Sequence, residues 1–247
     1  MATKRIEKQD GIVLHALRYG ETSLVVRVFT RQHGLHSFMV RQSGQRRKSS
    51  GGVLFQPLTH LEFLTFRGKG NSGLDAMREA RLLTSPLLAA PGVLRSSVAL
   101  FVADVLNQTI RHQEADLPLY QFVENFIAKV MVAGNELLTD LPLIFMMQLA
   151  DLMGFAPLMN YSPDKRLFDL MEGRFTSHAI HGYYIPAEWA EGFQMLTERC
   201  RGEISELSLP SGTRSTLLAF MIEYFQLQVS GIGEIKSHRV LREVLSV

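Results

Sequence analysis

The chain has 247 residues, 46% of them hydrophobic and 20% charged, which is the balance of an ordinary globular protein with one large core or two modest ones. Its one cysteine, Cys200, excludes an intrachain disulfide. The polar N-terminus and the short apolar runs predict neither a secretion signal nor a membrane span. We therefore expect a soluble, cytoplasmic protein.

Charge is divided unevenly along the chain. Residues 1–81 hold 14 Lys or Arg and 6 Asp or Glu, a net charge of +8, whereas residues 82–247 hold 12 and 18, a net of −6. This asymmetry predicts two surfaces with different partners. Nucleic acid or an anionic membrane would suit the basic part.

Five short strand-like runs follow one another in the basic part. In the second run, Leu24, Val26 and Val28 share one face, whereas Arg27 and Phe29 share the other. The runs are residues 11–17, 24–30, 35–41, 58–66 and 74–81, the last being a weaker strand or a strand-to-helix junction. Five strands with meander-like connections fit a small β-barrel, and the OB-fold is the five-stranded barrel used on nucleic acid.

A cationic segment from Arg41 to Gly52 separates the third and fourth runs. It carries four positive charges, no negative charge and no long apolar side chain, and its Gly and Ser residues predict a solvated loop. A cationic loop on a β scaffold indicates a surface for a polyanion. The alternative is a solvated run of charge with no partner.

The candidate DNA contacts are eight cations and one aromatic side chain. The cations are Arg27, Arg31, Arg41, Arg46, Arg47, Lys48, Arg67 and Lys69. Any one of them could be merely solvated, but as a set they favour contact with phosphates. Phe29, Phe38 and Phe66 are candidates for base stacking, with core packing as the alternative. Phe29 is the best of the three because it shares a strand face with Arg27.

Helical periodicity begins after Pro86. The expected helices span residues 93–110, 119–132, 141–153, 187–199, 211–229 and 236–245. The third is predicted to start at Leu141-Pro142, to stop at Gly154 and to lie centrally, because it is apolar nearly all round. The expected fold is therefore a two-domain α+β protein. Residues 1–82 form an OB-fold nucleic-acid-binding domain, and residues 83–247 form a helical domain with an irregular insert at 155–186.

Enzymatic motifs are missing from the sequence. The Gly44–Ser49 segment ends in Lys-Ser but lacks the second glycine and the spacing of a phosphate-binding P-loop. The six acids of the basic part are scattered, which disfavours a metal-dependent nuclease, and the eight histidines form no His-Glu-x-x-His pattern. We expect a non-enzymatic protein without a cofactor. An RNA-binding or ribosome-associated OB-fold protein is the alternative, followed by a nuclease and a pure scaffold.

Several segments resemble the RecO recombination-mediator family in order and spacing. They are Asp10–Leu14, Tyr19–Glu21, Phe29–Arg31, Arg46–Ser49 with Gln56–Leu58, and Leu152–Pro157. The resemblance implies a protein that binds single- and double-stranded DNA and anneals complementary strands. It also implies co-operation with RecR, in the RecFOR pathway on the nucleoid, in loading the recombinase onto DNA coated by single-strand-binding protein. A groove on the helical domain would take the acidic, Phe-ended tail of single-strand-binding protein.

The sequence departs from the family pattern in two places. Many members carry two Cys-x-x-Cys zinc-binding pairs, but Ser162 and Lys165 stand at the first pair here. His178 and His181 keep the spacing of the second pair, and two ligands do not close a structural zinc site. We expect no metal, and aromatic and apolar packing in its place, by Tyr161, Leu167, Phe168, Phe175, Tyr183 and Tyr184. The second departure is Gln42–Gln45, where the family has a tighter Arg-Gly-x-Arg pattern.

Overall fold

The computed structural model describes residues 6–41, 54–66, 74–85, 92–111, 113–201, 207 and 209–245. The chain divides into two compact units, Met1–Val132 and Ala133–Val247. In the described ranges, the first unit contains a β-barrel and two helices, and the second contains four helices and a small sheet. The barrel strands end at Thr84, close to the predicted boundary after residue 82, but the compact unit extends through two further helices.

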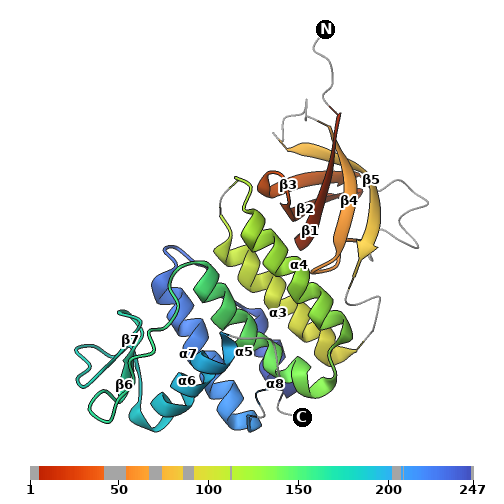
Figure 1. Ribbon diagram of the computed structural model, residues 1–247. Helices are drawn as coiled ribbons and strands as arrows, with labels where there is room; N and C mark the ends of the chain where they lie inside the picture. Colours follow the sequence, from red (N-terminus) through yellow and green to blue (C-terminus); the bar gives the residue numbers. More distant parts are fainter. Residues whose placement is uncertain are drawn as a thin grey trace. The chain divides into compact units, whose positions relative to one another are not determined.

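The predicted five-stranded barrel is confirmed (Figure 1). Its strands are β1 (Ile6–Tyr19), β2 (Ser23–Thr30), β3 (Gly34–Arg41), β4 (His60–Phe66) and β5 (Asp75–Thr84). They close in the order β1-β2-β3-β5-β4, with β3 and β5 parallel and all other neighbours antiparallel. Closure leaves no unpaired sheet edge, which removes the usual route to edge-to-edge aggregation.

The barrel interior follows from the two-residue alternation of its strands. Its core contains Val13, Val26, Val28, Phe38, Val40, Phe55, Leu61, Phe63 and Met77. Gly11 lies on the same face of β1 as Val13. A Cβ atom at Gly11 would lie 2.5 Å from Val28 Cγ1 and 3.0 Å from the Phe29 carbonyl oxygen, so β1 and β2 approach closely only because this residue has no side chain.

Two helices of the first unit follow the barrel in the part of the chain that the structure describes. They are α3 (Val93–Thr109) and α4 (Leu117–Val132), which lie side by side (Figure 1). Helix α3 contacts β1, and α4 supplies the fully buried Tyr120. Both helices match the predicted ranges to within two residues.

The second unit is built around α5 (Asn135–Leu152), in which every residue from Leu141 to Met147 is buried, as its apolar surface predicts. The predicted start at Leu141 was wrong. Pro142 lies inside the helix rather than at its first turn, so the proline marks the loss of one backbone hydrogen bond and not a helix start. The predicted stop is confirmed by Gly154, which has φ +83° and donates to Asp151, while Phe155 donates to Ala150.

The remaining helices of the second unit are α6 (Ala187–Cys200), α7 (Ser211–Gln228) and α8 (Ser237–Leu245). Helices α5 and α7 contact each other, and α8 contacts α7. None of the helices in the described ranges combines the length and the apolar character that crossing a bilayer requires.

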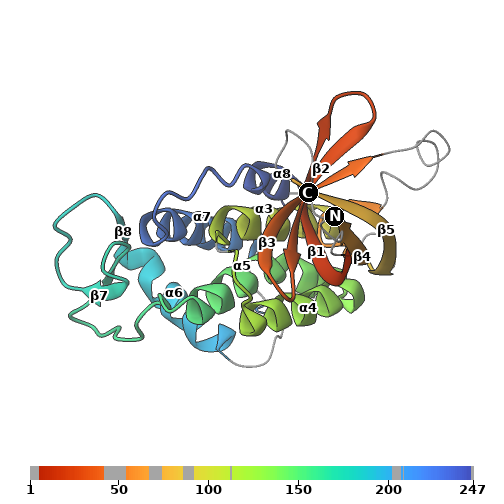
Figure 2. The same cartoon turned by 90° about the horizontal axis from the view of Figure 1, so that it is seen from above.

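The predicted irregular insert contains a small sheet of three short strands. They are β6 (Leu167–Asp169), β7 (Arg174–Thr176) and β8 (Tyr184–Ile185), in the order β7-β6-β8. Helix α6 lies against this sheet (Figure 2). Residues 155–166 connect α5 to the sheet without a helix or strand of their own.

Aromatic rings hold the insert to the helices, as predicted. Phe168 is fully buried, and its ring centroid lies 4.9 Å from that of Phe175 and 4.7 Å from that of Phe193 on α6. Tyr161 packs against Phe175 at 5.4 Å. Tyr183, by contrast, is 47% exposed and is not part of this core. Edge-to-face aromatic pairs of this kind add to the burial of their apolar area.

A buried ion pair fixes the start of α7. Asp140 is 1% exposed, and its carboxylate accepts hydrogen bonds from Arg214 Nε at 2.8 Å and from the Leu207 amide at 2.7 Å. Arg214 also donates to the Leu209 carbonyl at 2.9 Å. The carboxylate therefore ties α5 to α7 and to the segment that precedes α7.

We predict that Asp140→Ala lowers the free energy of unfolding by about 3 kcal/mol, because it leaves a buried guanidinium without its counter-charge. Urea denaturation monitored by circular dichroism measures the change. Glu172→Ala is the control, since its pair with Arg174 is 3.6 Å long and both side chains are more than half exposed; it should change stability by less than about 0.5 kcal/mol. Equal losses in the two variants would contradict this assignment.

Cys200 is predicted to be inert in the native protein. Its side chain is buried, and burial, reinforced by the Asp140 carboxylate, raises the pKa of the thiol to about 12. Because the thiolate is the reactive form, labelling by a disulfide reagent at pH 8 should be about a thousandfold slower in native than in urea-unfolded protein. Comparable rates in the two states would show that the thiol is accessible.

Candidate nucleic-acid interface

Four of the nine predicted site residues lie in the part of the chain that the structure describes: Arg27, Phe29, Arg31 and Arg41. The other five, Arg46, Arg47, Lys48, Arg67 and Lys69, lie outside the described residues. The structure nevertheless fixes where the two basic segments leave the barrel. One follows Arg41 at the end of β3, and the other follows Phe66 at the end of β4.

Arg41 is exposed and lies at the edge of the barrel. It pairs in register with Ser23 on β2, which pairs in turn with Tyr19 on β1. Residues paired in this way point to the same face of a sheet, so Tyr19 and Arg41 lie about 10 Å apart, two strand spacings, on one face. Tyr19 is 59% exposed, and the neighbouring Arg18 is exposed as well. Arg18 pairs with Leu24, which pairs with the core residue Val40, so it points to the opposite face, and we call Tyr19 and Arg41 the hairpin surface.

Arg18 and Tyr19 were not among the residues predicted to contact DNA. It interpreted Tyr19-Gly20-Glu21 only as a turn, whereas β1 runs to Tyr19 and displays both side chains at the end of a hairpin. An exposed aromatic ring beside cations is the pattern that supports base stacking next to phosphate contacts. The signal in the sequence was the Arg-Tyr pair at a hairpin turn.

Arg27 is half-buried on β2. Burial, followed by the charge of Arg111, lowers the pKa of its guanidinium. Both effects disfavour a positive charge at this position, so a bound anion would relieve them. The contact of Arg27 with a phosphate stays a prediction.

Arg31 has a different environment from the one the sequence predicted. Its Nε donates to Asp10 Oδ2 at 3.0 Å, and its Nη2 donates to Glu124 Oε1 on α4 at 2.6 Å. The guanidinium also lies 4.6 Å from the centroid of the Tyr120 ring. Burial opposes its charge, but the two carboxylates together raise the pKa of Arg31. Arg31 thus joins the barrel to α4 through two of its five donors, and its contact with a phosphate stays a prediction.

The same cluster contains His60 and Tyr120, hydrogen-bonded to each other at 3.1 Å. Burial lowers the pKa of His60 despite the nearby Glu124 and Asp10 carboxylates, and burial raises the pKa of Tyr120. Both side chains thus favour their neutral forms. With two carboxylates and one guanidinium, this network has no surplus positive charge for a phosphate.

The stacking role predicted for Phe29 is not compatible with its position. Phe29 is fully buried, and its ring lies 5.4 Å from that of Tyr120, because α4 covers this part of the outer face of β2. Phe38 is 3% exposed and packs against Phe63 inside the barrel. Phe66 is half-buried, with the guanidinium of Arg78 at 5.1 Å from its ring centroid. Of these rings, only Phe66 retains an outward position.

Metal binding by the described residues depends on whether their His, Cys, Asp and Glu side chains lie close together. Among them, no group of three or more His, Cys, Asp or Glu side chains is placed to hold a metal ion. At the positions of the family's zinc pairs, Ser162 and Lys165 form a tight turn in which the Lys165 amide donates to the Ser162 carbonyl at 2.9 Å. His181 lies 3.3 Å from Asp169, and His178 is hydrogen-bonded to Ser177. These residues do not fit a four-ligand zinc site.

Comparisons with known proteins agree with this architecture. Residues 1–86 match the family model described as "Recombination protein O N terminal". The chain is also similar along its length to proteins named DNA repair protein RecO. The relative from Phocaeicola vulgatus is 28% identical over 244 residues, which cover 98% of this chain and 100% of the relative.

Two further relatives carry the same name. The protein from Bacteroides fragilis is 29% identical over 242 residues, or 97% of this chain and 99% of the relative. The protein from Porphyromonas gingivalis is 28% identical over 236 residues, or 94% and 96% of the two chains. A family match over the barrel, together with relatives of one name that span nearly the whole chain, supports the RecO family as the family of this protein.

Proposed function

We propose that this protein is a non-enzymatic mediator of DNA repair and recombination that binds single- and double-stranded DNA and anneals complementary strands. The relatives named DNA repair protein RecO support the repair role. The observation that carries the DNA-binding role is the net charge of +8 on residues 1–81, on a closed barrel whose hairpin surface displays Tyr19 and Arg41.

Annealing by such a surface needs no bond-making side chain. Two DNA strands repel each other through their phosphates, and cations that neutralise part of this charge release counterions and lower the barrier to their approach. Contacts to phosphates leave the base edges free to pair. Arg27, Arg41 and the Arg46-Arg47-Lys48 cluster are the proposed phosphate contacts, with Arg67 and Lys69 as further candidates.

Partners follow from the family resemblance. We propose co-operation with RecR in loading the recombinase onto DNA coated by single-strand-binding protein, with the nucleoid as the place of action. The acidic second part of the chain, with a net charge of −6 on residues 82–247, supports a separate surface for protein partners. A groove for the tail of single-strand-binding protein would need apolar pockets edged by cations.

The basic cluster provides the main test. Replacing Arg46, Arg47 and Lys48 together with Ala should weaken DNA binding and slow annealing of two complementary oligonucleotides, followed by fluorescence quenching. If all three contact phosphates, the slope of log K against log salt for single strands should fall in magnitude by about 2.

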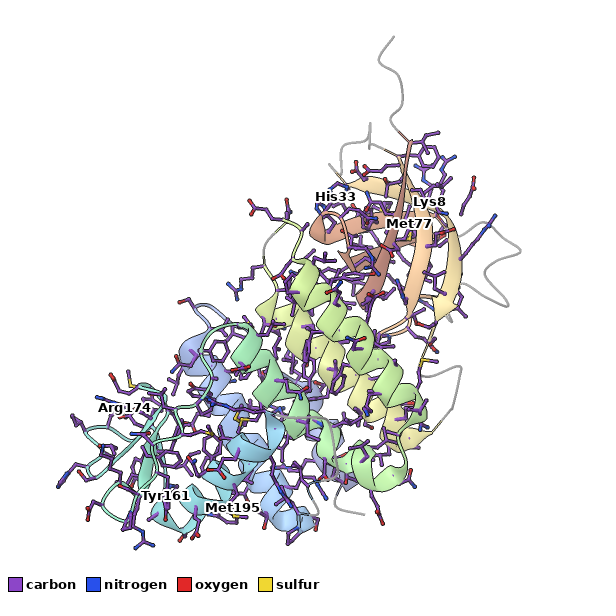
Figure 3. The ribbon with its side chains drawn as sticks, viewed as in Figure 1. Lys8, His33, Met77, Tyr161, Arg174 and Met195 are labelled. Carbon is purple, nitrogen blue, oxygen red and sulfur yellow. The ribbon has the colours of Figure 1, made fainter. Side chains whose placement is uncertain are left out.

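A matched control removes three exposed cations from the second unit. Lys165, Arg166 and Arg174 are exposed in and beside the β6–β8 sheet (Figure 3 labels Arg174), and they lie outside the proposed interface. Their triple Ala variant should keep the wild-type affinity and salt slope. Unchanged affinity and slope in the Arg46-Arg47-Lys48 variant would refute the proposed role of the cluster.

An RNA-binding protein remains the second candidate, because a cationic barrel attracts either polyanion. Competition separates the two: a labelled single-stranded DNA is displaced by unlabelled DNA or RNA of the same length and sequence. We expect DNA to compete at least as well as RNA, since phosphate contacts do not require a 2′-hydroxyl. A clear preference for RNA would favour the second candidate.

A further inference from the structure

The outer face of strands β1, β2 and β3 carries a row of apolar side chains next to the hairpin surface. Leu17 on β1 pairs with Val25 on β2, which pairs with Met39 on β3, so the three side chains point to one face of the sheet. They point outward, because Val26, the neighbour of Val25, belongs to the barrel core. Leu17 is 60% exposed, and Val25 and Met39 are half-buried. We call Leu17, Val25 and Met39 the apolar row.

Cations lie on both sides of the apolar row. Two residues further along each strand in one direction, about 7 Å away, lie Tyr19 and Arg41 of the hairpin surface. Two residues along in the other direction, His15 on β1 pairs with Arg27 on β2. Besides burial, the charge of Arg111 lowers the pKa of Arg27, so a further cation lies near this side. The apolar row thus lies between two cationic rows that are about 14 Å apart along the strands.

Helix α4 sets the limit of this face beyond Arg27. In the next row, Phe29 pairs with Leu35, and the two side chains are 0% and 4% exposed. The ring of Phe29 lies 5.4 Å from that of Tyr120 on α4. The accessible part of the face therefore runs from the Arg27 row to the hairpin surface. Beyond the hairpin surface the chain continues into residues 42–53, which hold three cations and no carboxylate.

An apolar row between two cationic rows matches the chemistry of an unpaired nucleic-acid strand. The phosphates of the strand suit the cations, and its unstacked bases are flat plates whose faces suit apolar and aromatic side chains. The ring of Tyr19, 59% exposed beside the row, adds a surface for stacking. In a duplex, each base face is covered by a neighbouring base pair. The apolar row therefore has nothing to contact on a duplex.

We propose that the apolar row and its flanking cations form a subsite that holds an unpaired DNA strand and releases it once the strand pairs, which rests on the DNA binding proposed above. The faces of the bases contact the row, so their edges stay free for a complementary strand. When a base pairs, its faces stack on the neighbouring base pairs and leave the row. The duplex keeps only phosphate contacts, so the subsite distinguishes single strands from duplex DNA without reading a sequence.

Leu17→Ser combined with Tyr19→Ser tests the subsite in the full-length protein. Because both side chains are exposed, the variant should keep the wild-type circular dichroism spectrum. Its affinity for an oligothymidylate of about 15 nucleotides, measured by fluorescence anisotropy, should fall about ten-fold, whereas its affinity for a duplex of the same length should stay unchanged. The slope of log K against log salt should also stay unchanged, because neither side chain carries a charge.

A matched variant removes the same kinds of side chain from the second unit. Ile180 and Tyr183, between β7 and β8, are 94% and 47% exposed, and Ile180→Ser with Tyr183→Ser should leave both affinities at wild-type values. Unchanged binding of oligothymidylate by the Leu17 and Tyr19 variant overturns the subsite and leaves the row to another occupant, such as a protein. An equal loss of affinity for the duplex overturns it as well. If the wild-type protein binds neither DNA at low salt, the proposed function fails together with the subsite.

Discussion

The contact between Arg31 and Glu124 determines how the basic part of the chain is used. It ties the β2–β3 turn of the barrel to α4, and Asp10 on β1 completes the bridge from the other side of the guanidinium. The same packing buries Phe29 against Tyr120. One part of the barrel's outer face is therefore packed against α4 and is not exposed to solvent. That part of the face is not accessible to a ligand, whereas Tyr19 and Arg41 are exposed.

The strands and helices could be predicted because the sequence of each segment determines them. Alternation of two residues places Val26 and Val28 inside the barrel, and Gly154 ends α5 because glycine adopts a positive φ without strain. Individual site residues could not be predicted in the same way. Arg27 and Arg31 are four residues apart and look alike in sequence, yet one stays half-buried beside another arginine while the other is bound by two carboxylates. That difference depends on Glu124, 93 residues further along the chain, so no local pattern could contain it.

The start of helix α5 could not be predicted from the local sequence either. Thr139-Asp140-Leu141-Pro142 has the composition of a helix start, but Asp140 is used as a buried partner for Arg214 and for the amide of Leu207. The tertiary ion pair and the burial of Leu138 and Leu141 outweigh the local cost of an internal proline. In the insert at residues 155–186, by contrast, the aromatic residues predicted which side chains pack together. Phe168 touches Phe175, Phe193 and Tyr224, so one ring connects the small sheet to two helices without a metal ligand.

Closure of the barrel gives its two ends different chemistry. Strands β1, β3 and β5 share a direction, so their N-terminal residues Glu7, His36 and Asp75 converge at one end, and the C-terminal residues Tyr19 and Arg41 lie at the other. A sequence average hides this division, because the net charge of +8 describes the whole basic part. Phe66 pairs with Ile6 at the Glu7 end, so residues 67–73 follow the barrel from that end, whereas residues 42–53 follow Arg41 at the other end.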